Sequence, residues 1–244
     1  MHEDELWLTA WFNNHLAGAA NSILGLVHMT AQDPARPWEN WIVMELLVVA
    51  IMMAGAALLR PRLSVEKPGK FQHVMEAFYG FFKNTMEDVG IEHGGKYLGY
   101  FGTVFLFILV MNLIGLIPGL ESPTMFPAVP LGLALVTFLF YNALGFGHHG
   151  PKYLLQFVGP IWWLAPLMIP IEFASHLARP MSLTIRLYAN MFAGERVTTT
   201  FMSLIHLLVP VLFMGLHVFV AFLQAYIFMI LSMIYVKGAI SHDH

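Results

Sequence analysis

The sequence predicts an all-α polytopic membrane protein with about five membrane helices, a cytoplasmic surface amphipathic helix, and two final helices that are long and tilted. Apolar residues make up 58% of its 244 residues and charged residues only 11%, whereas a soluble domain has about 25% charged residues. The mean hydropathy is +0.67, and several apolar runs are long enough to cross ~30 Å of hydrocarbon. We expect one membrane domain over residues 1–244.

The composition excludes several classes of function. The chain has no cysteine, so disulfides, thiolate metal sites and thiol catalysis are excluded. Its net charge of -3 includes no basic block, so we expect no nucleic-acid partner. Twelve histidines raise the alternative of an intramembrane metalloenzyme, but they are scattered and form no His-Glu-x-x-His motif. We therefore expect neither a metal nor a cofactor.

The first forty residues, 1–40, are predicted to form an external segment. Met1–Glu5 is acidic and lacks both the positive region of a cleaved signal peptide and the arginines of a transit peptide. This favours a bacterial or organelle-encoded chain. Residues 6–30 are mildly amphipathic and indicate an interfacial or luminal segment that ends at Pro34 and Pro37.

The first clear membrane span covers residues 41–59, about 19 residues and enough for the hydrocarbon core. Basic residues follow it directly, at Arg60, Arg62, Lys67 and Lys70. By the positive-inside rule this end is cytoplasmic, so the N-terminus lies outside.

Residues 71–89 have a different pattern. Apolar residues recur there at helical spacing opposite a polar face, which predicts an amphipathic helix. Such a helix lies either on the cytoplasmic membrane surface or, as an alternative, against the transmembrane bundle with one face in water.

Residues 97–146 are predicted to form a membrane hairpin. Its spans are 97–117, ended by Pro118-Gly119, and 130–146. The loop 121–127 has no basic residue and is expected outside, and His148 and His149 are expected in a solvated cytoplasmic loop.

Residues 160–236 are predicted to form two long tilted helices, and the C-terminus is then cytoplasmic. The stretch 203–236 has no acidic or basic side chain apart from two histidines. As a helix, its 34 residues would extend roughly 50 Å. It is therefore either strongly tilted or broken near Pro210.

A polar line follows one face of the first of these helices. Its members recur every three or four residues: Glu172, Ser175 or His176, Arg179, Ser182, Arg186 and Asn190. A guanidinium is permanently charged, and a charge inside a bilayer costs several kcal/mol or more. Arg186 is therefore the first functional candidate, with a structural ion pair as the alternative. Asn190 either serves function or links helices.

Glu195 follows Arg186 by nine residues, about 900° of helical rotation, so it lies on the opposite face. The two charges are therefore expected in different environments rather than in one salt bridge. On the final helix His217 and Gln224 are seven residues apart and nearly aligned, and a histidine titrates near neutral pH. With Asn112 and Glu172, these groups are candidates for water-filled proton routes.

Three segments together resemble subunit a of the F-type ATP synthase. The run Pro180-x-Ser182-Leu183-x-x-Arg186-Leu187-x-x-Asn190-x-x-Ala193-Gly194-Glu195 resembles the centre of that family's sequence. The stretch from His217 through Leu223-Gln224-Ala225-Tyr226-Ile227-Phe228 resembles its last segment, and Phe107–Pro118, with Met111-Asn112-Leu113, its second span. The resemblance covers roughly residues 40–240.

The resemblance implies a stator subunit of the F0 sector that couples ion translocation to ATP synthesis or hydrolysis. It implies two proton half-channels against a rotating ring of c subunits, with ATP chemistry on other subunits. Arg186 matches the family's essential arginine and Asn190 its polar neighbour, and Glu195, His217 and Gln224 match groups of the ion pathways. Glu172 and His176 would line the pathway toward the cytoplasm. The loop 121–127 departs from the family because it lacks the acidic and amide residues that many members carry there.

The implied partners are the c-subunit ring, the b-subunit peripheral stalk, the rest of the F1F0 complex and the lipid bilayer. The implied location is the bacterial inner membrane. A stand-alone ion channel or solute transporter is the alternative function, although no internal repeat supports a transporter built from inverted halves.

Overall fold

The computed structural model describes residues 5–26, 33–62, 64, 69–91, 94–117, 119–151, 153, 163, 165–204 and 208–241. Within these ranges the chain is helical and has no strand. The α-helices are α1 (Trp7–Leu26), α2 (Asn40–Leu59), α3 (Lys70–Val89), α4 (Leu98–Ile114), α5 (Ala128–His149), α6 (Ala165–Leu204) and α7 (Leu208–Ile240). Short 3-10 helices are η1 (Arg60–Arg62), η2 (Gly94–Lys96) and η3 (Pro123–Met125).

The predicted all-α membrane architecture is confirmed. Among the described residues, three helices are long and apolar enough to cross a bilayer: α2, α5 and the Leu212–Ile240 part of α7. The fourth apolar helix, α4, has 17 residues. The remaining long helix, α6, carries the charges that the sequence places in this region.

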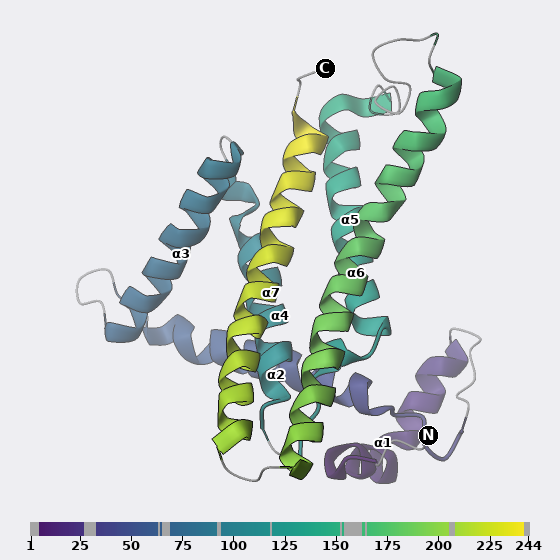
Figure 1. Cartoon of the computed structure of the whole chain (residues 1–244), viewed down its shortest axis with the longest axis vertical. Helices are drawn as coiled ribbons and strands as arrows, with labels where there is room; N and C mark the ends of the chain where they lie inside the picture. The colour runs from purple at the N-terminus through teal and green to yellow at the C-terminus, as the bar shows by residue number, and fades with distance from the viewer. Residues whose placement is uncertain are drawn as a thin grey trace.

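The two C-terminal helices are too long to cross a bilayer upright. With 40 and 33 residues, α6 and α7 extend roughly 60 and 50 Å, against a ~30 Å hydrocarbon core. They lie side by side, and α5 packs against both. In Figure 1, α2 runs across the lower part of this pair at a large angle. When α2 crosses the bilayer upright, α6 and α7 are therefore strongly tilted in it.

The core forms where α4 and α7 pack along each other with α5 beside them. Large side chains on all three helices are fully or almost fully buried there: Phe101, Phe105, Ile108 and Met111 of α4, Tyr141 of α5, and Phe228, Met229 and Met233 of α7. Because these side chains fix α7 against α4 and α5, they leave one side of α6 and α7 outside the core.

The helix α3 is clearly amphipathic, as its pattern predicts. Its C-terminal half buries Phe82, Thr85 and Met86 against α4 and α7, whereas its N-terminal half exposes Phe71 and Val74. Gly90, with φ of 83°, ends the helix in the left-handed conformation that glycine adopts without strain. In Figure 1, the N-terminal half of α3 stands away from the bundle.

One local expectation was wrong. His148 and His149 form the last turn of α5 rather than a loop, because the helix continues through Gly145 and Gly147. The stretch 203–236 is divided between two helices, because α6 ends at Leu204 and α7 begins at Leu208. Pro210 then lies in the first turn of α7, where a missing N–H costs no helical bond.

A close contact at Gly145 generates a stability prediction. A Cβ added there would lie 2.7 Å from Cζ and 2.9 Å from Cδ2 of the Tyr153 ring, which is buried and packed edge-on against Phe146. Gly145→Ala should therefore lower the thermal unfolding midpoint of the detergent-solubilised complex, although alanine favours a helix by about 1 kcal/mol. On the same helix, a Cβ at Gly132 meets nothing within 4 Å, so Gly132→Ala should leave the midpoint unchanged or raise it. Equal midpoints for both variants would refute the contact.

Candidate functional site

A buried apolar stripe determines which side of α6 packs against the core. Leu183, Leu187 and Met191 are each 2% exposed or less and pack against the core. They recur every four residues, so they fix the rotation of α6 about its own axis. The polar residues of the same helix are consequently held at the two edges of this stripe.

Arg186 lies at one edge of the stripe and is partly exposed. Within the described part of the chain it makes no ion pair and no hydrogen bond. One turn further on, Asn190 donates from Nδ2 to Oε1 of Gln224 on α7, at 2.8 Å. Gln224 is 2% exposed, so this amide pair links α6 to α7 beside a charge that has no internal partner.

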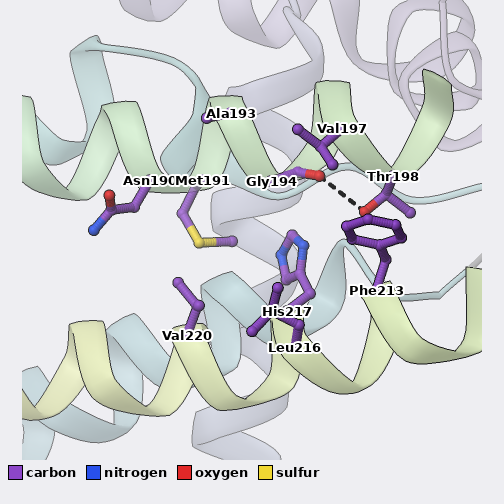
Figure 2. Close-up of a pocket in the computed structure, with 10 residues that line it drawn as sticks. All are labelled: Asn190, Met191, Ala193, Gly194, Val197, Thr198, Phe213, Leu216, His217 and Val220. Carbon is purple, nitrogen blue, oxygen red and sulfur yellow. Dashed lines mark hydrogen bonds between the residues drawn. The ribbon is translucent and has the colours of Figure 1, made fainter. Parts of the chain in front are cut away.

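His217 occupies a pocket between α6 and α7 (Figure 2). The pocket has a volume of about 250 Å³ and extends from Asn190 to Thr198 along α6. The His217 ring points toward Gly194, where an added Cβ would lie 3.2 Å from Nδ1. His217 is 8% exposed, and among the described residues its Nε2 has no hydrogen-bond partner. A buried imidazole nitrogen without a partner is costly unless water or a passing proton reaches it.

Glu195 lies at the other edge of the stripe from Arg186, as the nine-residue spacing predicts, and is partly buried. No ion pair joins the two residues. Glu195 does not line the His217 pocket, although its neighbour Gly194 does. The carboxylate is thus within one residue of the pocket but on a different side of α6.

His176 belongs to a separate polar cluster near the opposite end of α6. Asn142 of α5 donates from Nδ2 to the Phe138 carbonyl at 2.7 Å, which leaves its Oδ1 as an acceptor. Tyr153 Oη donates to that Oδ1 at 3.2 Å, and His176 Nε2 lies 3.0 Å from it. The amide orientation therefore assigns the proton of His176 to Nε2.

Other residues of this end follow the same helix face. Glu172, one turn before His176, is partly exposed. Arg179 places its guanidinium carbon 5.4 Å from the centre of the Tyr235 ring on α7, a cation–π contact. Tyr141 is buried in the core, where its ring contacts those of His176 and Tyr235 and its Oη lies 3.5 Å from His176 Nε2. The sequence pattern did not identify Asn142, Tyr141 or Tyr153.

Asn112 lies in a buried network rather than in the His217 pocket. Its Oδ1 accepts from Thr124 Oγ1 at 2.7 Å, and its Nδ2 lies 3.5 Å from the Ala221 carbonyl of α7. Ser122 donates to the Met111 carbonyl at 2.9 Å and lies 2.7 Å from Thr124 Oγ1. Through this network the short helix η3 packs against α2, α4, α5 and α6.

The structure therefore divides the predicted site residues among three places. Arg186, Asn190, Gln224 and His217 lie along the α6–α7 contact, with Glu195 at its far edge. Glu172 and His176 lie toward the N-terminal end of α6, and Asn112 lies between α4, η3 and α7. The sequence analysis did not identify the buried Ser122 and Thr124 as site residues. The only signal for them in the sequence was their position beside Pro123, between two apolar spans. Among the described residues, no group of three or more His, Cys, Asp or Glu is arranged to hold a metal ion.

Comparison with known proteins identifies the family. The family model described as "ATP synthase A chain" matches residues 41–237. The chain belongs to this family.

Three relatives named "ATP synthase subunit a" are similar over 90% or more of this chain. The "ATP synthase subunit a" of Solibacter usitatus is 56% identical over 234 residues, covering 96% of this chain and 100% of the relative. That of Koribacter versatilis is 48% identical over 242 residues, covering 98% of each chain. A third, from Trichlorobacter lovleyi, is 40% identical over 219 residues, covering 90% of this chain and 93% of the relative.

The ATP synthase A chain match contains every one of the eight candidate residues, from Asn112 to Gln224. It begins at residue 41, at the start of α2, so α1 lies outside it. The match therefore covers the positions of all the candidate site residues, whereas α1 lies outside it.

The Asn142 cluster generates a prediction. Asn142→Leu removes the Oδ1 that accepts from Tyr153 Oη and lies 3.0 Å from His176 Nε2, and removing one partner of a buried hydrogen bond costs about 1–3 kcal/mol. The thermal unfolding midpoint of the solubilised complex should fall by several degrees. The matched control is Asn84→Leu, because Asn84 is exposed on α3. A midpoint for Asn142→Leu equal to that of the control would show that the cluster does not stabilise the fold.

Proposed function

We propose that this chain acts as subunit a of an ATP synthase, the membrane subunit that couples ion flow to the movement of a rotor. The observation that carries this function is Arg186, which has no ion-pair partner among the described residues, in a chain of the ATP synthase A chain family. The relatives named above all carry the printed name "ATP synthase subunit a". ATP chemistry is assigned to other subunits.

The rotor contact is assigned to the outer side of α6 and α7. Exposed apolar side chains cover it: Met181, Ile185 and Ala189 on α6, and Leu216, Phe219 and Ile227 on α7. Arg186 borders this surface, so it reaches a group that passes along α6 without being buried in the chain's own core. We infer that the passing group is a carboxylate of a ring of small c subunits.

Arg186 acts as a fixed barrier charge. An opposite charge nearby favours the ionised form of a carboxylate, so a rotor carboxyl that reaches Arg186 gives up its proton. The same positive charge repels protons that would pass directly from one side to the other. Each proton delivers only about 2.3 kcal/mol per 100 mV, so coupling requires that this direct leak be blocked.

One proton route is assigned to the His217 pocket. Three features supply a path for water or protons toward the outer surface: the His217 Nε2, which has no partner among the described residues, the small residue Gly194 opposite the ring, and the Asn190–Gln224 amide pair at one end. Glu195 serves the same route from the adjacent side of α6. Asn112 supports it through α7, whose Ala221 carbonyl lies between His217 and Gln224 in the sequence.

The second route is assigned to the N-terminal end of α6, with Glu172 at its opening. His176 donates its Nε2 proton to Asn142, so we assign its exchangeable position to Nδ1. The two routes then lie on opposite sides of Arg186 along one helix, and a proton passes between them only on the rotor.

The remaining assignments follow from the sequence. The basic residues after α2 support a cytoplasmic location for that end, with the N-terminus outside and the C-terminus in the cytoplasm of a bacterial cell. The partners are the c ring, the b-subunit stalk and the rest of the F1F0 complex within the lipid bilayer of the inner membrane.

Removal of the barrier charge should abolish coupling. In vesicles that contain the whole complex, Arg186→Ala should reduce ATP-driven proton pumping to background, measured with a pH-sensitive dye. Arg196→Ala is the matched control because Arg196 lies on the same helix, is exposed, and places its guanidinium carbon 5.1 Å from the centre of the Phe192 ring. It should pump normally. Normal pumping by Arg186→Ala would overturn the proposed function.

The first route should respond to loss of either titratable group. His217→Leu and Glu195→Leu should each slow passive proton flux through F1-stripped membranes about tenfold or more, while the amount of the chain in the complex stays unchanged. His148→Leu, at the exposed end of α5, should not alter the flux. If a variant with both residues replaced conducted at the wild-type rate, neither residue would belong to the route.

A further inference from the structure

Tryptophan is concentrated at one place in the fold. Four of the six tryptophans lie within residues 7–41: two on α1, one in the segment before α2 and one in the first turn of α2. Trp7 is 68% exposed and Trp11 is 50% exposed. These two rings lie four residues apart, so they share one face of α1. The proposed function makes no use of them.

The opposite face of α1 is fixed by hydrogen bonds to the segment that precedes α2. The Asn13 side chain engages both backbone groups of Trp38: Oδ1 accepts from its N–H at 3.0 Å and Nδ2 donates to its carbonyl at 3.1 Å. The indole N–H of Trp38 donates to the Leu16 carbonyl at 3.0 Å, and Asn21 Nδ2 donates to the Pro34 carbonyl at 2.8 Å. Residues 34–38 therefore run along α1 in the opposite direction.

This docking decides which residues of α1 face outward. Thr9, Asn13 and Ala20 are buried on the inner face. Trp7 and Trp11 consequently point away from the chain, and the Trp11 ring is stacked on His15 with ring centres 4.9 Å apart. The outward aromatic face is thus a fixed feature of the fold, since the buried amide of Asn13 holds the helix in one rotation.

The level of this face relative to the bilayer follows from α2. The backbone N–H of Leu6 donates to Oδ1 of Asn40, the first residue of α2, at 3.3 Å. Because α2 is an apolar spanning helix, its first turn lies in the headgroup layer. Trp41 in that turn donates its indole N–H to the Glu39 carboxylate at 2.6 Å, the arrangement of an interfacial tryptophan with one polar and one apolar end.

We propose that α1 is a lipid-binding interfacial helix, with Trp7 and Trp11 inserted among the phospholipid headgroups at the N-terminal end of α2. Lipid is the occupant because α2 packs little of itself against the rest of the chain: only 17% of its most apolar 18-residue stretch is buried. The surface next to α1 is therefore itself lipid-facing. In Figure 1, α1 turns away from the line of α2 instead of continuing it, as a helix lying along the membrane surface does. The site lies outside residues 41–237.

The absence of cysteine in this chain permits a direct test. Trp7→Cys and Trp11→Cys are each labelled with a nitroxide in the assembled complex, in proteoliposomes, with the cysteines of the other subunits replaced. Collision rates with oxygen, which concentrates in lipid, and with a water-soluble nickel chelate are measured by electron paramagnetic resonance. Val49→Cys, on the exposed middle of α2, is the hydrocarbon reference.

Labels at positions 7 and 11 should favour oxygen over the nickel chelate, at a shallower depth than the label at position 49. Higher collision with the chelate would mean that the face lies in water, and low collision with both, together with an immobilised spectrum, would mean that another protein subunit covers it. Either result would overturn the lipid assignment. ATP-driven pumping by the labelled complexes reports on the proposed function separately.

A second variant tests the hydrogen bonds that hold α1 in its orientation. Asn13→Leu removes all three hydrogen bonds of the Asn13 side chain, to Trp38 and to Glu5. In this background the label at position 11 should lose its defined depth and become more mobile, whereas the label at position 49 should not change. An unchanged depth at position 11 would show that the polar network does not hold α1 in place.

Discussion

A permanent positive charge without an internal partner is the constraint on which the rest of this structure depends. Arg186 cannot lose its proton, and no carboxylate of the described chain pairs with it. In a bilayer such a charge persists only beside water, a partner or both. The apolar stripe on α6 and the Asn190–Gln224 bond hold it at the border of the outer surface, where a partner can reach it.

The surrounding architecture supplies what that position requires. The lengths of α6 and α7 require a strong tilt in the bilayer, and tilt spreads the polar groups of α6 over a long path beside a rotor. The pocket at His217 and the cluster at His176 then occupy different stretches of the same helix, with Arg186 between them. The buried Asn112–Thr124–Ser122 network closes the bundle behind α7, so neither route needs to pass through the core.

Helical periodicity predicted the elements and the faces of α6 well, because it depends only on local spacing. The opposition of Arg186 and Glu195 is such a result. What it could not give were partners far apart in sequence: Asn142 and His176 are 34 residues apart, and so are Asn190 and Gln224. The end of α5 was predicted too early, at residue 146, because Gly147 suggested a loop, whereas the helix continues through it to His149. The docking of α1 also depends on such a distant pair, Asn13 with Trp38.

The most direct test of the barrier role of Arg186 is passive proton conduction through F1-stripped membranes whose rotor ring is covalently locked to this chain. With the ring unable to turn, the wild type should conduct no protons above background. Arg186→Ala should conduct through the locked complex, because protons then pass between the two routes without rotation. A locked Arg186→Ala complex that stays as tight as the wild type would contradict the assignment of Arg186 as the barrier between the routes.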